Sequence, residues 1–344
     1  MISIKDIAKQ AGVSVSTVSR VINGKDCVRP EKRDHVLQVI QQTGFVPNRA
    51  ARDMVLKSTS KVGIFLPETF NQFQRQLFSE IAHNLESLGF HTSFFFIPMH
   101  QRGEHTCLQK MKSERLDGVI LLREIELPEF REYLTEHHIP TVLVTFEHET
   151  WSKAATIHIS EEEAAYVAVT HLIGLGHRRI ALVGGKKFSF GTQRELGYRR
   201  AITEANISWQ DELVVYVDAY HMAHGMMATQ RLLEQTKDFS AVFAITDDLA
   251  IGCIRQLKDQ GYSIPRDISV VGIDDIEISS YITPRLTTIQ QPLKEMGRMA
   301  VSLLHEEMHK QRDNHPNSAL PFTLIKREST ATPKTISQEH SKSM

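Results

Sequence analysis

Apolar residues near the start of the chain recur at the spacing of short α-helices. A first helix over 4–10 is predicted by an apolar face made of Ile4, Ile7, Ala8 and Ala11. Gly12 ends this helix and supplies a turn, and Ser14 is a suitable N-cap for a second helix over 15–22. The Asn-Gly pair at 23–24 stops the second helix.

A third helix over 30–43 begins at a proline, a residue that the first turn of a helix accepts. Gly44 closes it, and its apolar face consists of Val36, Val39 and Ile40. A further short helix is predicted over 49–56, followed by a polar linker over 57–61.

From residue 62 the pattern changes to short β-rich runs separated by helical segments. The runs lie at 62–67, 93–97, 117–122, 141–145, 179–185, 241–246 and 268–274, with the first two intervening helices near 72–88 and 103–114. Such alternation predicts βαβ units, and therefore parallel sheets with helices on both faces. About 265 residues of this pattern suit two doubly wound α/β lobes better than one.

These patterns predict four segments: a helical head, a hinge with a linker, a two-lobed core and a tail without apolar periodicity, which we expect to be disordered. Their predicted bounds are 1–46, 47–61, 62–328 and 329–344. Within the core, we expect lobe 1 over 62–160 and 291–320, and lobe 2 over 161–290 and 321–328.

Charge is distributed unevenly between these segments. The whole chain of 344 residues has a formal charge of −1. Residues 1–58 hold ten basic and five acidic residues, a charge of +5, which leaves −6 for the remainder. A basic head of this size suits the neutralisation of nucleic-acid phosphates, although a solvated surface patch has the same composition.

Composition excludes several classes of protein. Three distant cysteines form no disulfide framework, so a reducing compartment is expected. The first ten residues carry charges and no apolar core of a signal peptide, and no apolar run reaches the roughly 18 residues of a membrane helix. We therefore expect a soluble protein of the cytoplasm, bound to the nucleoid when it occupies DNA.

The first two helices fit a helix-turn-helix. This motif needs a small residue in its first helix, a glycine in the turn and an apolar residue that packs the second helix onto the first, roles that suit Ala8, Gly12 and Val18. The second helix would then present its N-terminal part to DNA. A small helical bundle without a DNA role remains the alternative from these residues alone.

The predicted DNA contacts divide by chemistry. Arg20 can bond guanine with two hydrogen bonds, Ser16 can donate or accept, and Val15 can contact a thymine methyl group. The hydroxyl groups of Ser14, Thr17 and Ser19 suit phosphate oxygens at a helix N-terminus.

Longer motifs resemble the LacI/GalR family of bacterial transcription regulators. They run in the family's order over roughly residues 2–328: IKDIAKQAGVSVSTVSRVINGK, GFVPNRAARDM, HLIGLGHRRIALVGG, RELGYRRA, ITDDLAIG, DISVVGIDD and PRLTTIQQP. The resemblance implies a homodimer that binds double-stranded operator DNA, and a core similar to periplasmic binding proteins.

The resemblance also implies a hinge that forms a short helix on specific DNA. Asn48, Arg49 and Arg52 are candidates for phosphate or groove contacts. Met54 occupies the position of an apolar wedge between base steps, where leucine is usual in the family. From the residues alone, Met54 is equally consistent with packing in a linker helix.

An effector pocket is expected beyond the carboxyl ends of the strands, where open α/β sheets bind ligands. The resemblance assigns to it Arg194, Thr246, Asp274 and Gln291, with Tyr220 packed on the ligand and Phe73 as a weaker candidate. The alternatives are a pair of Arg194 with Glu195 or another surface acid, and a plain core role for Tyr220. Asp247 and Asp248 are interpreted as a helix N-cap pair. The residues at the ends of the predicted lobe 1 strands do not indicate which of them contact the effector.

Two short motifs resemble enzyme motifs, but each lacks residues that the enzyme site requires. His305 to His309 reads HEEMH, a zinc-protease signature that also needs a third ligand and an open coordination position. The glycines at 174 and 176 lack the third glycine of a dinucleotide loop. No catalytic, metal or cofactor site is therefore predicted.

The expected function is that of a transcription regulator, a repressor whose operator affinity is controlled by a sugar or sugar derivative, including sugar phosphates. A corepressor-dependent or nucleobase-responsive regulator of the same family is the alternative, and a zinc metallohydrolase is a remote one. A sugar-binding receptor of similar lobed fold would carry a signal peptide and lack the head. We expect the dimer surface on lobe 1 helices, including 72–88.

Overall fold

A computed structural model describes most of the chain. The described residues are 2–22, 27–45, 60–68, 71–98, 101–146, 151, 154–185, 189–309 and 316–334. The chain divides into two compact units, residues 1–59 and 60–344. The hinge candidates Asn48, Arg49, Arg52 and Met54 lie outside the described residues.

The first unit contains the three helices that the apolar spacing predicts. They are α1 (Ile4–Gln10), α2 (Val15–Ile22) and α3 (Pro30–Thr43). The side chain of Ser3 caps α1, and Ser14 Oγ accepts from the backbone N–H of Thr17 at 3.2 Å, as expected of an N-cap. Gly12 and Gly44 both have φ of +61°, a conformation that glycine adopts without steric strain.

The core of this unit holds α2 against α1. Ala8 and Val18 are buried together with Ile7, Val21, Val36 and Val39, while Ile4 and Val13 pack on this cluster. The small, turn and apolar positions of the predicted helix-turn-helix are therefore occupied as the motif requires.

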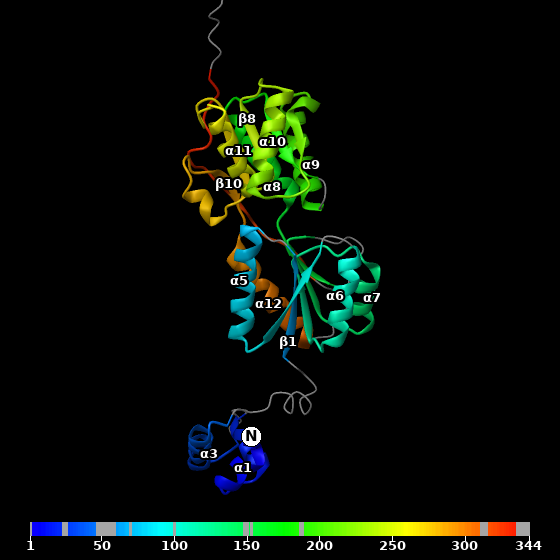
Figure 1. Ribbon diagram of the computed structural model, residues 1–344, viewed down its shortest axis with the longest axis vertical. Helices are drawn as coiled ribbons and strands as arrows, with labels where there is room; N and C mark the ends of the chain where they lie inside the picture. Colours follow the sequence, from blue (N-terminus) through cyan, green and yellow to red (C-terminus); the bar gives the residue numbers. More distant parts are fainter. Residues whose placement is uncertain are drawn as a thin grey trace, which may run out of the picture. The chain divides into compact units, whose positions relative to one another are not determined.

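The second unit begins with a parallel sheet in the strand order β11-β5-β4-β3-β1-β2. Its strands are β1 (Lys61–Pro67), β2 (His91–Ile97), β3 (Gly118–Leu121), β4 (Thr141–Val144), β5 (Ala155–His158) and β11 (Asn317–Ala319). Its helices are α5 (Gln72–Ser87), α6 (Gln101–Ser113), α7 (Pro128–Glu136) and α12 (Leu293–His309). Helix α5 packs against α12, and α6 and α7 lie across the sheet from them (Figure 1).

A second sheet has the order β12-β10-β9-β8-β6-β7. Its strands are β6 (Ile180–Gly184), β7 (Val214–Tyr216), β8 (Ala241–Ala244), β9 (Ser269–Asp274), β10 (Thr287–Gln290) and β12 (Thr323–Ile325). The accompanying helices are α8 (Glu161–Gly174), α9 (Ser189–Glu204), α10 (Met222–Gln235) and α11 (Asp247–Asp259), with 3₁₀ turns η1 (Asp211–Leu213) and η2 (Glu277–Ser280). All its pairs are parallel except β10 with β12.

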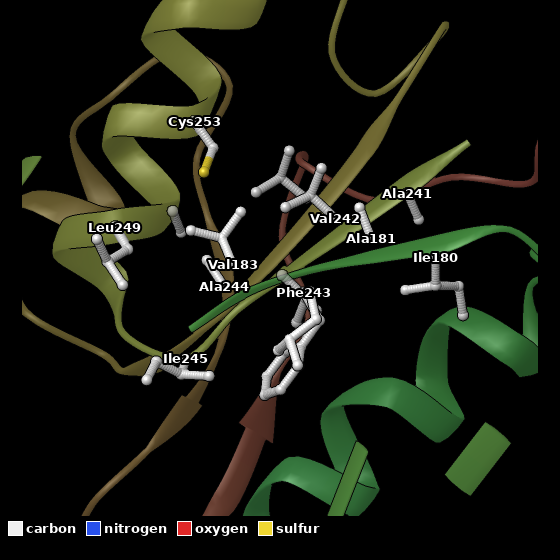
Figure 2. Packing of buried hydrophobic residues seen from close by; sticks show 14 of the residues in the cluster. Ile180, Ala181, Val183, Ala241, Val242, Phe243, Ala244, Ile245, Leu249 and Cys253 are labelled. Carbon is white, nitrogen blue, oxygen red and sulfur yellow. The ribbon is translucent and has the colours of Figure 1, made fainter. Parts of the chain in front are cut away.

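The core of the second lobe is built from the strands predicted to be buried. Figure 2 shows Leu249 and Cys253 of α11 beside Val183 and Ala244 of the sheet, with all four side chains fully buried. Parallel strands that are covered on both faces consist of continuous apolar runs. This explains why β6, β8 and β9 could be predicted from the sequence.

The chain passes three times between the two sheets: from β5 to α8, from β10 to α12 and from β11 to β12. The two doubly wound lobes predicted from the sequence are thus confirmed, with the antiparallel edge strand β12 as an addition. No helix in the described part of the chain is long and apolar enough to span a membrane.

The prediction that disorder begins at residue 329 is wrong for residues 329–334. Ser329 is fully buried, and its Oγ donates to the carbonyl oxygen of Val270 at 2.6 Å. Ala331 N donates to Ser269 Oγ at 3.0 Å. Short polar residues without apolar spacing are ordered here because Ser269 and Val270, at the start of β9, supply their hydrogen bonds.

His177 holds this C-terminal segment through a buried neutral imidazole. Its Nε2 lies 2.9 Å from the carbonyl oxygen of Ala331, so Nε2–H donates, and Nδ1 lies 2.8 Å from Ser240 Oγ. Burial lowers the pKa of His177 below 6.5, and it lowers the pKa of the neighbouring His171 as well.

We expect the stability of the core to fall as the pH drops below 6.5. The unfolded state takes up protons that the folded state resists, so stability is complete above the unfolded pKa and decreases toward the lower folded pKa. His177→Gln should lower the free energy of unfolding by about 1–3 kcal/mol at pH 7.5 and flatten its pH dependence. Urea denaturation between pH 5 and 8 measures both, and the exposed His105→Gln is the control. An unchanged pH dependence in His177→Gln would contradict this role.

Helices α10 and α11 approach closely at a glycine. A Cβ added at Gly252 would lie 2.0 Å from the carbonyl oxygen of Met222, in the backbone of α10. We expect Gly252→Ala to destabilise the core by about 1–3 kcal/mol, because the helices must separate. Gly174→Ala is the matched control, since no atom lies within 4 Å of its added Cβ and alanine favours helix. Equal urea midpoints for the two variants would contradict the close packing.

Candidate functional site

The head presents a polar and partly apolar surface at the start of α2. Val15, Ser16 and Arg20 are exposed, and Thr17 and Ser19 are half-buried. Val15 has 41% of its surface exposed and is therefore accessible to a thymine methyl group. The Ser14 hydroxyl bonds those of Ser16 and Thr17 at 2.8 Å each. Base-reading and phosphate-binding groups therefore share one exposed helix end.

Buried polar side chains gather at the carboxyl ends of β8, β9 and β10 in the second lobe. Arg194 of α9 is 3% exposed, and its guanidinium bonds three partners. Nε donates to Glu161 Oε2 at 2.6 Å, one terminal nitrogen donates to the carbonyl oxygen of Ile245, and the other lies 3.4 Å from Asp274 Oδ1. A buried guanidinium needs such pairing, because the unpaired charge would be strongly destabilising.

Asp274 is the centre of this cluster. It ends β9 with φ of +129°, a strained conformation that persists only where the surroundings enforce it. Gln291 Nε2 donates to the same Oδ1 atom at 2.8 Å. Burial raises the pKa of Asp274 well above its ordinary value; Arg194 opposes this shift, while Asp247 and Glu161 reinforce it. Strain and a buried carboxyl together are typical of a functional position.

Aromatic side chains adjoin the guanidinium. The ring of Tyr220 lies 5.2 Å from the ring of Phe190, and the guanidinium carbon of Arg194 lies 5.1 Å from the Phe190 centroid. Of the residues that the resemblance assigns to the pocket, Arg194, Asp274 and Gln291 are in direct contact, and Tyr220 adjoins them through Phe190. Phe73 belongs to the first-lobe core cluster instead.

The interpretation of Asp247 and Asp248 as an N-cap pair is wrong. Thr246 is the N-cap of α11, since its side chain accepts from Leu249 N at 3.3 Å. Asp247 is fully buried and accepts hydrogen bonds from Ile276 N, Ser279 Oγ and Thr288 Oγ1. Burial raises the pKa of Asp247 to about 6, against these hydrogen bonds. Asp247 therefore fixes the loop that follows Asp274.

The alternative pairing of Arg194 with Glu195 does not occur. Glu195 bonds Arg199, one helical turn further along α9, at 2.8 Å. The partner that the structure adds is Glu161, the first residue of α8, together with the Ile245 carbonyl and Phe190. Glu161 stands in a run of three glutamates at a helix start, a pattern that also suits an exposed first turn, so the sequence carried no signal for it.

In the first lobe, Arg123 follows β3 at the corresponding end of the sheet. Its guanidinium pairs with Glu104 at 2.7 Å and donates to the carbonyl oxygens of Ile97 and Pro98. Glu104 in turn accepts from Leu127 N at 2.8 Å. This buried ion pair stabilises the loops at the edge of the first sheet.

The HEEMH segment forms the last turns of α12. His309 Nδ1 lies 2.7 Å from the carbonyl oxygen of His305, so this nitrogen is occupied by the helix backbone. Within the described ranges, no group of three or more His, Cys, Asp or Glu residues could hold a metal ion. The motif thus has no third ligand among the described residues.

Comparisons with known proteins agree with this arrangement. A model of the bacterial regulatory proteins of the lacI family matches residues 3–48, and a periplasmic binding protein-like domain matches residues 169–330. Catabolite control protein A of Priestia megaterium is 32% identical over 335 residues, which cover 96% of this chain and 99% of that protein.

Two solved structures share the fold over most of their length. The lac repressor dimer bound to operator and the anti-inducer ONPF has a TM-score of 0.85 and 25% identity, with 96% of this chain and 99% of that chain covered. The complex of the transcriptional regulator CelR with cellobiose has a TM-score of 0.73 and 28% identity, with 96% and 100% covered. The chain belongs to the LacI family of bacterial regulatory proteins, and it is a DNA-binding transcriptional regulator.

Proposed function

We propose that this protein is a homodimeric repressor whose affinity for operator DNA is controlled by a small-molecule effector bound at the Arg194–Asp274–Gln291 cluster. Two heads would read a pseudo-palindromic operator with half-sites about one helical turn apart. The operator complex of the lac repressor dimer supports this mode of binding.

The DNA contacts follow from the exposed end of α2. Arg20, Ser16 and Val15 would read base edges, while Ser14, Thr17 and Ser19 would contact phosphates. Asn48, Arg49 and Arg52 are proposed groove or phosphate contacts of the hinge, and Met54 is its proposed wedge.

The buried cluster is the observation that carries the effector proposal. Arg194, Asp274 and Gln291 come from α9, β9 and the end of β10, so three separate elements supply convergent donors and acceptors. Tyr220 and Thr246 complete the proposed site, and Phe73 would reach it only from the other lobe. The cellobiose complex of CelR supports a sugar-like effector.

Control requires that the effector bind two states of the protein with different affinity. We propose that these states differ in the angle between the lobes and thereby in the hinge segments. Induction releases the operator, whereas corepression strengthens its binding. We further propose that the protein acts in the cytoplasm and has no enzymatic activity, since its relatives are regulators.

The test is a thermal-shift screen of sugars, sugar phosphates and nucleosides on the full chain, followed by operator binding with each hit. We expect a hit to change operator affinity by at least about tenfold, within the usual range of allosteric coupling. Asp274→Asn should lose this response and still bind operator. Hits that leave operator affinity unchanged would contradict the regulatory role.

A further inference from the structure

The buried cluster around Arg194 carries more negative than positive charge. Glu161 and Asp274 flank the single guanidinium, and Asp247 lies close enough to influence Asp274. Even with a protonated Asp274, the charge of Glu161 offsets that of Arg194. The cluster therefore offers no net positive charge to an anion.

Two buried side-chain atoms at this edge of the second sheet are acceptors without a hydrogen-bond partner. Gln291 is 4% exposed, and its Oε1 accepts no hydrogen bond while its Nε2 is held by Asp274. Asp248 is 6% exposed, and its Oδ2 likewise has no hydrogen-bond partner. Both atoms are acceptors, so a ligand that satisfies them must donate hydrogen bonds.

Two other features that attract anions are already neutralised. Helix α11 begins at the same edge of the sheet, but Asp247 and Asp248 stand in its first turn and compensate its positive end. The guanidinium of Arg327, which follows β12, pairs with Asp275, the residue after Asp274, at 2.6 Å. A phosphate or carboxylate would find acceptors and paired cations here, whereas a hydroxyl group can both donate and accept.

We infer that Glu161 is a specificity-determining residue that excludes anionic effectors, so that the site accepts uncharged, hydroxyl-rich ligands and rejects their phosphorylated or carboxylated forms. This inference rests on the proposed effector site. It separates neutral sugars from sugar phosphates, which the sequence left together.

The first experiment needs no knowledge of the effector. Inorganic phosphate is titrated against wild type, Glu161→Gln and Glu162→Gln at constant ionic strength, and the melting temperature is followed. Glutamine keeps the hydrogen bond to Arg194 Nε and removes the charge. Glu162→Gln is the matched control, because Glu162 pairs with Arg200 on the surface of the same helix turn.

We expect saturable stabilisation by phosphate in Glu161→Gln alone, with an affinity at least about tenfold above that of wild type, as loss of one buried unit charge produces at an effective dielectric of about 20. Equal phosphate responses of Glu161→Gln and wild type would overturn the inference. The inference would also be overturned if wild type bound phosphate saturably with the same affinity as Glu161→Gln.

The second experiment uses matched probes: ribose with ribose 5-phosphate, glucose with glucose 6-phosphate, and glucitol with gluconate. For any pair that binds, wild type should favour the neutral member by at least about tenfold, and Glu161→Gln should narrow that ratio. A charged member that binds wild type as tightly as its neutral partner overturns the inference but leaves an effector-controlled regulator intact. If probes bind and leave operator affinity unchanged, the proposed function fails. The charge preference of the site is still measured by the ratio of the affinities for the neutral and the charged probe of each pair.

Discussion

Arg20→Ala should abolish sequence-specific operator binding while the protein stays folded. A bidentate arginine–guanine pair contributes about 1–3 kcal/mol of discrimination, so two half-sites in a dimer lose about 2–6 kcal/mol, on the order of 30-fold to 10⁴-fold in affinity. Arg20 is exposed on α2, so we expect its removal to leave the core of the head intact. Fluorescence anisotropy with operator and with scrambled DNA of equal length measures the loss.

Lys32→Ala separates base reading from charge in this experiment. Lys32 is an exposed residue of α3, so its removal takes one positive charge from the head as well. We expect Lys32→Ala to lower the affinity for operator and for scrambled DNA by similar factors, and to make both affinities less dependent on salt concentration. The assignment of α2 as the reading helix fails if Arg20→Ala retains full operator affinity, or if both variants reduce the operator-to-scrambled ratio equally.

Arg194→Lys should remove most of the effector response and leave operator binding in the absence of effector nearly intact. A lysine ammonium is a single point charge and cannot span Glu161, the Ile245 carbonyl and Asp274 together. Loss of one or two charge-assisted hydrogen bonds lowers effector affinity by roughly a hundredfold. Calorimetric titration with the hit of the screen measures the affinity.

Arg200→Lys is the control on the same helix. Arg200 pairs with Glu162 and Glu163 at the surface, and surface ion pairs contribute about 0–1 kcal/mol. Its effector affinity and melting temperature should match those of wild type. Unaltered effector affinity in Arg194→Lys would show that the ligand binds elsewhere.

The helices of the head follow from residues close in sequence. Gly12, Ser14, Pro30 and Gly44 act on the turn that contains them, so together with the apolar spacing they predicted all three helices with their observed bounds. The buried strands β1, β3, β4, β6, β8 and β9 were predicted for a related reason, because strands covered on both faces are apolar along their whole length. The buried strands β5 and β10 contain polar residues and were not predicted.

Short edge strands escaped prediction. Strands β11 and β12 have three residues each, none of them buried, so their identity depends on the neighbours that they pair with. The same applies to residues 329–334, whose order comes from Ser269, Val270 and His177 rather than from their own pattern.

For the effector site, the resemblance supplied Arg194, Asp274 and Gln291, and the structure brings these three together. It could not supply Glu161, which contacts Arg194 across 33 residues of sequence. The interpretation of Asp247 from the residues alone was wrong, because a carboxylate after a strand resembles a helix cap until the loop that it holds is in place.

The sequence by itself determined the helix-turn-helix, the alternation of strands and helices, and the division into a basic head and an acidic core, because each depends on neighbouring residues or on simple counts. Only the tertiary structure decided the strand order, the triple crossing between lobes and the charge around Arg194. Those properties depend on contacts between distant residues, and a linear pattern carries no record of which buried charge finds which partner.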